Sequence, residues 1–568
     1  MWYVDHSCMK SLLTDWLHKA IGQSAAQGNL PADAACLLTL SATKHDAHGD
    51  FATPIALLLA PREKTAPRTI AQRIVTLIQT HPDFSAWFSR VEIAGPGYIN
   101  FFLSPACGHR ALLEIIRQGE RYGRSTTGAG SRVQVEFVSA NPTGPLHVAS
   151  GRAAALGDAL CNLLSAVGFD TQREYYVNDI GNQVERLGHS VYLRYRQHFG
   201  ETITFPEEGY QGDYVIEIAQ AVAAAEGHRF LAGDETTAVA FFTTFALESL
   251  LGSIRRDMTA FGVRFDRWFS EGSLAEEIDR AIADLKARGC LYEQEGAWWL
   301  ATTRCADDKD RVVVRADGRR TYFASDIAYH HNKFARGFDR IINIWGADHH
   351  GYIGRVKAAV SLLGHPAERL TILIHQLVNL MRHGTPVPMS KRTGTFVTLK
   401  EVIDEVGVDA TRFFFLMRRA DTPLDFDLEL AKKHSNDNPV YYVQYAHARL
   451  CSVLRVAVES GIDPAAVARE ATVADLAGLT SAEEREIVKQ VALYPDQVRA
   501  AADALEPHRI VFYLQALAGM LHRYYFGHRI IGDDPALTRA RLVLVQAVQI
   551  VLQNALTLLG IRAPERMY

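Results

Sequence analysis

The sequence lacks the features of a disulfide-rich or zinc-binding protein. Its seven cysteines are scattered over 568 residues, and no two of them form a CxxC pair. Structural zinc sites take closely spaced cysteine or histidine ligands, and secreted disulfide frameworks use an even number of cysteines. The pattern therefore predicts reduced thiols and no protein-bound zinc.

The sequence also lacks an apolar run suited to a membrane span. Its most apolar late stretch, 542–561, is interrupted by Gln546, Gln549, Gln553 and Asn554. A bilayer span needs about 20 mostly apolar residues, so this spacing instead predicts a buried helix of a bundle. The N-terminus has no apolar core of the length that a secretion signal needs. We therefore expect a cytoplasmic protein without a membrane partner.

An excess of basic charge is missing as well. Lys and Arg number 60 against 64 Asp and Glu, which gives a formal net charge of −4. Proteins that hold nucleic acid through their overall field are basic, so any RNA contact must come from local patches. The length of 568 residues is too great for one hydrophobic core and predicts three or more domains.

The order of predicted elements indicates a multidomain α/β protein. Residues 1–115 alternate short strands and amphipathic helices, as in a small α/β module. Residues 130–425 follow the strand–helix–strand order of a Rossmann-type parallel sheet, with a helical insertion at about 183–307. Residues 426–568 are predicted to be an all-helical domain. The expected strands are 91–102 as a pair, 133–138, 172–177, 340–345 and 370–374, and the expected helices include 150–167, 352–363 and 441–456.

Two short motifs carry residues suited to phosphate chemistry. Pro145-Leu146-His147-Val148-Ala149-Ser150 stands where a strand gives way to a helix, whose N-terminal N–H groups and His147 favour phosphate oxygens. Met389-Ser390-Lys391-Arg392-Thr393-Gly394 is a polar loop whose Lys391 and Arg392 can close over a triphosphate. Taken alone, a histidine at a helix start is typical of a cap, and a Ser-Lys-Arg run is typical of a solvated turn.

Together these motifs resemble the HIGH and KMSKS signatures of class I aminoacyl-tRNA synthetases. Four further runs resemble the arginyl-tRNA synthetases of bacterial type: 136–147, 308–312, 322–329 and 438–449. The resemblance as a whole extends from residue 9 to residue 568. The resemblance implies an enzyme that uses ATP to activate arginine and transfers it to the 2′-hydroxyl of the terminal adenosine of tRNA-Arg. It also implies an anticodon-binding helical domain, a tRNA elbow contact by the N-terminal module, and arginine activation that needs tRNA.

The chain departs from the signatures at three positions. Ala149 and Ser150 replace the usual Gly-His, and Pro388 replaces the first lysine of the second signature. Ala149 adds a methyl group where the adenine ring is expected, and Ser150 cannot carry the positive charge of a histidine. These departures leave open a non-catalytic descendant that still binds tRNA.

Recognition of arginine requires negative or acceptor groups that fit a planar guanidinium. Asp326 with Tyr322 is the first choice, since residues i and i+4 share a face of a helix. Glu136, Asn141 and Asp348 would lie at the carboxyl edge of the sheet, where such sites form. By resemblance, Asn141, Tyr322 and Asp326 hold the substrate arginine. The alternative for Asp326 is a helix cap or a surface ion pair.

The ATP site is expected to combine both signatures with the loop after strand 340–345. Adjacent histidines such as His349-His350 and His330-His331 rarely reach one ion, so a ribose contact is favoured over a metal site. Magnesium is expected to arrive with ATP. The predicted ATP-binding residues are Pro145, His147, Ala149, Ser150, Gly346, Asp348, His349, Met389, Ser390 and Lys391, and the catalytic ones among the signatures are His147, Ser150, Lys391 and Arg392.

The start of the helical domain carries aromatic and basic groups suited to splayed anticodon bases. The alternative is that the tyrosines pack in the core of the bundle. The predicted tRNA-binding residues are Tyr441, Tyr442, Tyr445, Arg449 and Met567.

Three other hypotheses stay open: the tRNA-binding relic, a class I ligase with a small-molecule acceptor, and a cysteinyl or glutamyl specificity. By resemblance we expect a monomer that needs no obligate protein partner and binds no DNA. Met9 resembles a natural start, so deletion of Met1–Cys8 is expected to leave the melting temperature and aminoacylation unchanged.

Overall fold

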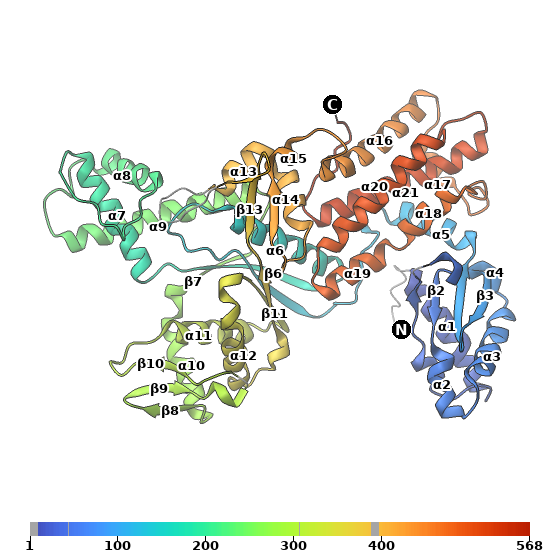
Figure 1. Ribbon diagram of the computed structural model, residues 1–568, viewed down its shortest axis with the longest axis horizontal. Helices are drawn as coiled ribbons and strands as arrows, with labels where there is room; N and C mark the ends of the chain where they lie inside the picture. The colour runs from blue at the N-terminus through green and yellow to red at the C-terminus, as the bar shows by residue number, and fades with distance from the viewer. Residues whose placement is uncertain (1–8, 44, 306, 388–396, 568) are drawn as a thin grey trace.

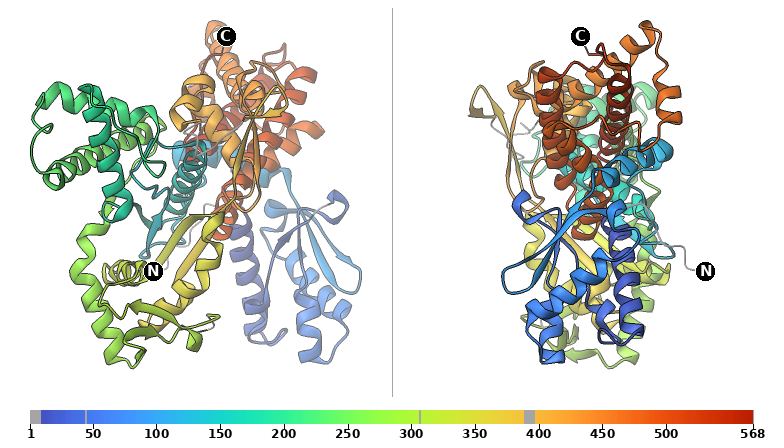
Figure 2. Two further views of the ribbon diagram at one scale, coloured as in Figure 1. Left: turned by 60° about the vertical axis from the view of Figure 1, so that its left-hand side comes forward. Right: turned by 90° about the vertical axis from the view of Figure 1, so that its right-hand side faces the viewer.

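The computed structural model describes residues 9–43, 45–305, 307–387 and 397–567. Met1–Cys8 and the core of the second signature, with Pro388, Met389, Ser390, Lys391 and Arg392, lie outside the described residues. The chain forms an elongated molecule, with an N-terminal domain and a helical insertion at opposite ends of its long axis (Figure 1). In the left view of Figure 2 these two parts again lie on opposite sides, and in the right view the N-terminal domain lies in front.

The N-terminal domain is an antiparallel sheet, in the order β1-β2-β4-β3, covered by helices. The strand pair expected at 91–102 is confirmed, as β3 and β4 joined by a Gly/Pro turn. On α3 the residues Ile70, Ile74 and Ile78 recur every four positions and are buried against this sheet, as an amphipathic helix requires. The elements are α1 (Met9–Ala26), η1 (Ala34–Leu37), β1 (Ser41–Ala42), η2 (Asp46–His48), β2 (Phe51–Thr53), α2 (Ile55–Glu63), α3 (Pro67–Gln79), α4 (Phe84–Trp87), β3 (Phe88–Ala94) and β4 (Tyr98–Leu103).

The central domain holds a five-stranded parallel sheet in the order β12-β11-β5-β6-β7. The four strands predicted for this domain are confirmed within a few residues. Gly157 of α6 lies against the ring of Phe137, where an added Cβ would come within 2.2 Å, so glycine permits the close packing of helix on sheet. The elements are β5 (Arg132–Glu136), α6 (Val148–Ala166), β6 (Asp170–Val177), β7 (Arg267–Ser270), α11 (Tyr322–Ala335), β11 (Arg340–Gly346), η6 (Ala347–Tyr352), α12 (Ile353–Leu362), η7 (Ala367–Arg369) and β12 (Leu370–His375).

The insertion at about 183–307 was expected to be mostly helical; the structure has helices α7 to α10 there, and its second part also contains short strands that the sequence analysis did not predict. Three helices with their own apolar core form the protruding part of the insertion. The chain then returns to the main sheet as β7 and builds a small antiparallel sheet in the order β10-β9-β8. Strands of four residues are too short for a clear alternation of apolar and polar positions. The elements are α7 (Asn182–His198), α8 (Asp213–Glu226), α9 (Glu235–Ala260), η4 (Glu271–Leu274), α10 (Ala275–Ala287), β8 (Leu291–Gln294), β9 (Ala297–Leu300), η5 (Thr302–Cys305) and β10 (Arg311–Val314).

The helical domain and its junction follow the sheet. A three-stranded sheet in the order β14-β13-β15 leads into the bundle, and α5 packs against α17, α18 and α21 of that bundle. The predicted boundary at 115 therefore falls inside α5. The elements are α5 (Pro105–Gln118), η3 (Gly119–Arg121), β13 (Val378–Arg382), β14 (Thr385–Pro386), α13 (Leu399–Val406), α14 (Val408–Leu416), β15 (Leu424–Asp427), α15 (Leu428–Lys432), α16 (Pro439–Glu459), α17 (Pro464–Glu470), α18 (Ala482–Ala492), α19 (Tyr494–Ala504), α20 (His508–Gly527) and α21 (Pro535–Leu558).

Two helices, α9 and α21, are long and apolar enough to cross a membrane by length and composition alone. The expectation for 542–561 was a buried bundle helix, and α21 indeed lies among α5, α16, α17 and α18 with its apolar residues buried. In α9 one stripe, with Phe242, Ala246 and Leu250, is buried against α7 and α8. Each helix thus has packing partners within the protein.

Candidate active site

The first signature lies at the N-terminus of α6. His147 is the N-cap residue, and its Nδ1 accepts a hydrogen bond from the backbone N–H of Ala149 at 3.2 Å. The helix begins at Val148, two residues earlier than predicted, so Ala149 and Ser150 belong to its first turn. The cap alternative is therefore confirmed for one ring nitrogen of His147. The N–H groups of Ala149 and Ser150 are both bonded to His147, so the start of α6 favours a phosphate through the positive end of its dipole.

A strained turn connects β5 to this signature. Val138 and Ser139 have φ of 68° and 40°, in the left-handed region that residues with a side chain seldom occupy. The Ser139 hydroxyl donates to Glu136 Oε1 at 3.0 Å and accepts from the Tyr176 N–H at 3.1 Å. The Tyr175 hydroxyl donates to the Ala140 carbonyl at 2.8 Å. These bonds fix the direction in which the chain leaves the sheet toward the signature.

The loop of the first signature also contacts the helical insertion. Exposed Asn141 donates from Nδ2 to Gln183 Oε1 at 2.8 Å. The Tyr214 hydroxyl of α8 donates to the Thr143 carbonyl at 2.7 Å, and Pro145 lies half-buried two residues later. Asn141 therefore lies on the outside of the loop, with its amide donor engaged by α7.

The described flank of the second signature meets the first. Thr398 forms an isolated antiparallel bridge with His147, and the Leu399 N–H donates to the Leu146 carbonyl at 2.8 Å. Thr398 also begins α13 as part of a capping box with Glu401. The chain that leaves the second signature is thus joined directly to the start of α6.

The loop after β11 supplies the third side of this region. Gly346 ends the strand, and Asp348 and His349 on η6 are exposed, with Nε2 of His349 3.6 Å from Asp348 Oδ2. Next to Gly346 in the sheet lies His375, which the sequence analysis did not select. Burial and the charge of Arg152 lower the pKa of His375 to about 4. His147 adds to this lowering and Asp348 opposes it. His375 thus marks where the ends of β11 and β12 meet the first signature.

The histidines of the pair on α11 point to different neighbours. Buried His330 is bonded to the Asp326 carbonyl and to Asn343, whereas His331 lies beside His365. Within the described ranges, no group of three or more His, Cys, Asp or Glu side chains could hold a metal ion.

Asp326 lies one turn into α11, in a position to receive a cation. Its Oδ2 accepts a hydrogen bond from the Tyr352 hydroxyl at 2.5 Å, and it forms no ion pair with any described residue. Burial raises the pKa of Asp326 to about 7, and the Tyr352 bond opposes this rise. It is neither a helix cap nor half of a surface pair. Tyr322, on the same helix, is 70% exposed.

A second carboxylate, Glu271, was missed by the sequence analysis. It is buried directly after β7, and burial raises its pKa, while hydrogen bonds with Tyr176 and Ser325 oppose the rise. Its charge also contributes to the raised pKa of Asp326. The sequence signal was its place after a sheet strand, but β7 had been assigned to the helical insertion.

Glu136, which was predicted to bind arginine, is already neutralised. Its Oε2 accepts a hydrogen bond from the fully buried Lys333 ammonium at 2.5 Å, and Lys333 also donates to Asn343. Glu136 therefore differs from Asp326, whose charge has no partner among the described side chains. The structure brings Tyr322 and Asp326 together on α11 and leaves Asp348 on η6, in the region of the first signature.

Three of the predicted tRNA residues, Tyr441, Tyr445 and Arg449, lie along one side of α16. Tyr441 stacks against His434 and Tyr445, with ring centroids 6.0 and 5.8 Å apart. Arg449 donates to the Tyr445 hydroxyl at 2.9 Å and lies over that ring. The surface is extended by Tyr525 of α20, also under Arg449, which the sequence analysis missed.

Tyr442 lies deeper than the other two tyrosines and packs against the core and His522, so the core alternative is confirmed for this residue. Met567 is half-buried near the C-terminus, and the preceding carbonyl of Pro564 is bonded to His447 of α16. The C-terminal segment therefore follows α16.

Comparisons with known proteins match all three parts of the chain. Residues 9–103 match the arginyl tRNA synthetase N terminal domain, residues 111–209 and 232–418 the catalytic domain of class I (R) tRNA synthetases, and residues 443–567 the DALR anticodon binding domain. Arginine–tRNA ligases from Syntrophotalea carbinolica and Citrifermentans bemidjiense are each 52% identical, over 98% of this chain and their entire length. The arginyl-tRNA synthetase structure from Thermus thermophilus, 25% identical, has a TM-score of 0.71 and covers 98% of this chain and 100% of its own. The chain belongs to the arginyl-tRNA synthetase family of class I aminoacyl-tRNA synthetases.

Proposed function

We propose that the protein activates arginine with ATP and transfers it to tRNA-Arg in the cytoplasm, as a monomer without an obligate partner. The arginine carboxylate attacks the α-phosphorus of ATP, which forms arginyl-adenylate and releases pyrophosphate. The 2′-hydroxyl of the terminal adenosine then attacks the activated carbonyl, which yields arginyl-tRNA and AMP. Neither DNA nor a membrane takes part.

The first signature is proposed to bind the phosphates. The first turn of α6, with Ala149 and Ser150, would direct the positive end of the helix dipole toward the phosphate oxygens. His147, whose Nδ1 caps the helix, would contribute to the same phosphate site from the N-cap position. Magnesium, carried by ATP, would neutralise part of the charge that develops on the leaving pyrophosphate.

The second signature and the loop after β11 are proposed to complete the ATP site. The bridge between Thr398 and His147 supports closure of Lys391 and Arg392 over the phosphates. The adenosine would lie between two parts of the site. Pro145 and the residues of the second signature would form one part, and the loop after β11 would form the other. In that loop Gly346, Asp348 and His349 would contact the ribose.

The environment of Asp326 is the observation that supports arginine as the substrate. Asp326 is half-buried, its pKa is raised although the charge of Lys333 opposes the rise, and it forms no ion pair with a described residue, so a bound cation would stabilise its ionised form. An arginine guanidinium supplies that charge and a planar set of donors. Tyr322 would cover the substrate, Asn141 would hold its ammonium end, and Glu271 would add to the negative potential. Because Glu136 is bonded to Lys333, its contribution would be to hold the surrounding turn.

The ladder of Tyr441, Tyr445 and Arg449 is proposed to stack anticodon bases of tRNA-Arg, with Met567 at its edge. Tyr442 would support the ladder from the core. The N-terminal domain, at the other side of the bundle from the insertion, would contact the tRNA elbow.

The test is arginine-dependent charging of bacterial tRNA by the purified protein with ATP and magnesium. We expect robust charging by the native chain and a loss of at least 100-fold in His147→Ala, with roughly 10²–10⁴-fold typical for a positioned catalytic group. Since His147 also caps α6, the control is His147→Asn, which keeps a capping acceptor. If both variants charge tRNA as well as the native chain, the assigned role of His147 is wrong.

The departures Ala149, Ser150 and Pro388 favour one alternative, a descendant that binds tRNA without charging it. Tight binding of tRNA-Arg by the native chain with no charging at any arginine concentration would establish this alternative. The variant Ala149→Gly combined with Ser150→His restores the usual first signature. A gain of charging in that variant would identify the departures as the cause.

A further inference from the structure

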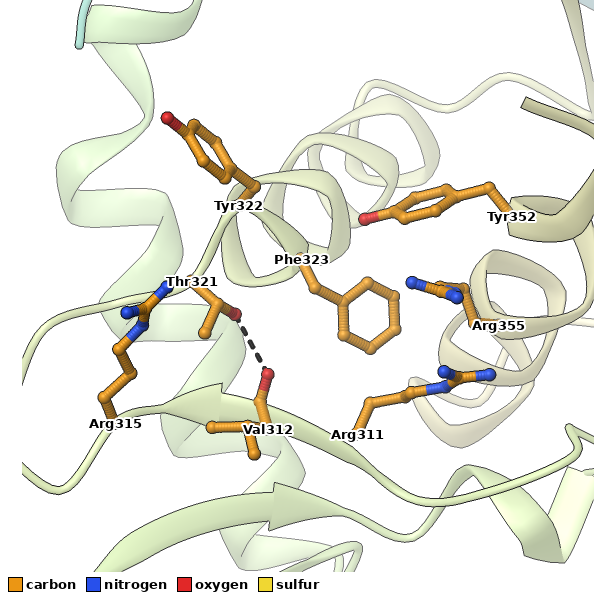
Figure 3. Close-up of a pocket in the computed structure, with 8 residues that line it drawn as sticks. All are labelled: Arg311, Val312, Arg315, Thr321, Tyr322, Phe323, Tyr352 and Arg355. Atoms are coloured by element: carbon orange, nitrogen blue, oxygen red, sulfur yellow. Dashed lines mark hydrogen bonds between the residues drawn. The ribbon is translucent and has the colours of Figure 1, made fainter. Parts of the chain in front are cut away.

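A cavity of about 310 Å³ opens beside Tyr322 and Tyr352, and nothing described so far occupies it. Its size lies at the lower end of ligand pockets, about 300–1,000 Å³. Figure 3 shows Arg311 of β10 and Arg355 of α12 on one side of Phe323, with Arg315 on the other side. The cavity therefore combines three guanidinium groups with the exposed ring of Tyr322, half-buried Tyr352 and buried Phe323.

Two of these arginines carry uncompensated charge. Arg311 is neutralised, because it donates to both oxygens of Asp307 at 2.8 and 3.0 Å. Arg355 has a buried Nε without a partner, and across the described ranges its guanidinium contacts only the face of Tyr352, at 4.5 Å. Arg315 is exposed at the rim of the cavity. The cavity thus presents unpaired positive charge that an anion would satisfy.

Two buried arginines of this chain, unlike half-buried Arg355, show what a structural role requires. Arg152 donates to four backbone carbonyls, those of Gln376, Leu377, Arg419 and Thr422. Fully buried Arg412 donates to two carbonyls and to Asp158. Arg355 has none of these partners, so its packing does not explain why a guanidinium is present.

The position of the cavity indicates the source of the anion. It shares Tyr322 and Tyr352 with the site proposed for arginine, whereas His147, Gly346 and Asp348 of the proposed ATP site do not line it. The acceptor hydroxyl must reach arginine, and the phosphate on the 5′ side of the same nucleotide lies within one nucleotide length of that hydroxyl. An exposed ring such as Tyr322 is suited to stack an unpaired base.

We propose that the cavity of Arg355, Arg315 and Tyr322 binds the phosphate that joins the terminal adenosine of tRNA to the preceding nucleotide. This inference rests on the proposed function, since it takes tRNA as the acceptor. Arg355 would hold the phosphate from the wall, Arg315 would close the rim, and Tyr352 would keep the Arg355 guanidinium in place. The phosphates of ATP are the competing source of the same chemistry.

The test is a binding cycle without ATP, with intact tRNA-Arg and tRNA-Arg that lacks its terminal adenosine and the joining phosphate. For the native chain we expect trimming to weaken binding about 10-fold, the order of one charge-assisted contact. The Arg355→Ala variant should bind intact tRNA more weakly than the native chain by a similar factor. It should bind intact and trimmed tRNA equally, because the substitution and the trimming remove the same contact. Its slope of log Kd against log salt should fall by about 0.7 for intact tRNA only.

Several variants keep the cycle interpretable. Arg355→Lys retains the charge without the planar guanidinium, and its affinity for intact tRNA should fall only a few-fold. Arg315→Ala, at an exposed position, should lose a few-fold and supplies the cycle if Arg355→Ala does not fold. Arg319→Ala is the matched control, since Arg319 is on the same turn and is paired with Asp317 outside the cavity. It should bind both tRNAs as the native chain does.

Three outcomes would overturn the proposal. In the first, trimming weakens tRNA binding by the Arg355→Ala variant as much as by the native chain, so the two losses of affinity multiply. The second is a native chain whose affinity does not change on trimming. The third is a Kd for ATP that rises 10-fold in Arg355→Ala, which would assign the cavity to ATP phosphates. Charging by the native chain is measured separately, so failure of the proposed function is distinguished from failure of the cavity.

Discussion

The acidic site around Asp326 and the basic cavity around Arg355 lie on either side of Tyr352. Their charges are opposite in sign, but their charged groups are arranged in the same way. Each contains one charged pair that is complete, Glu136 with Lys333 on the acidic side and Arg311 with Asp307 on the basic side. Each also contains charged groups without an ion pair among the described residues, chiefly Asp326 on the acidic side and Arg355 on the basic side. Tyr352 contacts both unpaired groups, since its hydroxyl bonds Asp326 and its ring faces Arg355.

The difference between paired and unpaired charges separates two roles. A buried ion pair that is complete holds the fold, and loss of one partner leaves a buried charge that costs free energy. A buried charge that lacks a partner destabilises the free protein and is available for a ligand of opposite sign. We therefore expect opposite effects on stability from substitutions at Glu136 and at Asp326, although both are carboxylates of the same site, at the end of β5 and on α11.

The largest effect is expected for Glu136→Gln. It leaves the Lys333 ammonium buried without its carboxylate, which should lower the free energy of unfolding by about 3–5 kcal/mol. Chemical denaturation measures this loss. A double variant, Glu136→Gln with Lys333→Met, should recover part of the stability, and an unchanged stability of the single variant would contradict the assignment of this pair.

Asp326→Asn should act mainly on the substrate. Asn keeps an acceptor for the Tyr352 hydroxyl but removes the negative charge, so KM for arginine should rise roughly 100-fold. Because burial raises the pKa of Asp326 above its unfolded value, the stability that this group gives is present at low pH and is lost as pH rises through about 7. The melting temperature of Asp326→Asn at pH 8 should therefore equal or exceed that of the native chain. A clear fall in melting temperature with normal KM would show that Asp326 is structural.

The smallest effect is expected for Tyr352→Phe, which connects the two regions. Arginine binding needs ionised Asp326, so its affinity should fall as pH drops through about 7 in the native chain. The Tyr352 hydrogen bond lowers the pKa of Asp326, and its removal should move this fall to higher pH and raise KM several-fold at pH 7. The measurement is KM for arginine from pH 6 to 9, with Asp326→Asn as a variant that should show no such dependence. A profile identical to that of the native chain would exclude Tyr352 from control of Asp326.

Much of the fold followed from local patterns. The strands at 91–102, 133–138, 172–177, 340–345 and 370–374 were predictable because their apolar residues are bounded by Gly, Pro and Asn turns. The short strands β7 to β10 were not, because four residues carry too few alternations to differ from a helical pattern. The first signature was placed at a helix start, while its exact N-cap residue required the structure.

The candidate site shows the same division. The sequence alone determined the family, the order of the domains and the types of residue at the active site, because these depend on motifs of a few adjacent residues. Only the tertiary structure decided that Glu136 is paired with Lys333, 197 positions away, while Asp326 is left for a ligand. Likewise it decided that Glu271, His375 and Arg355 lie beside the selected residues. The physical reason is that burial and charge compensation are properties of groups that meet in space, and the spacing of residues along the chain does not encode them.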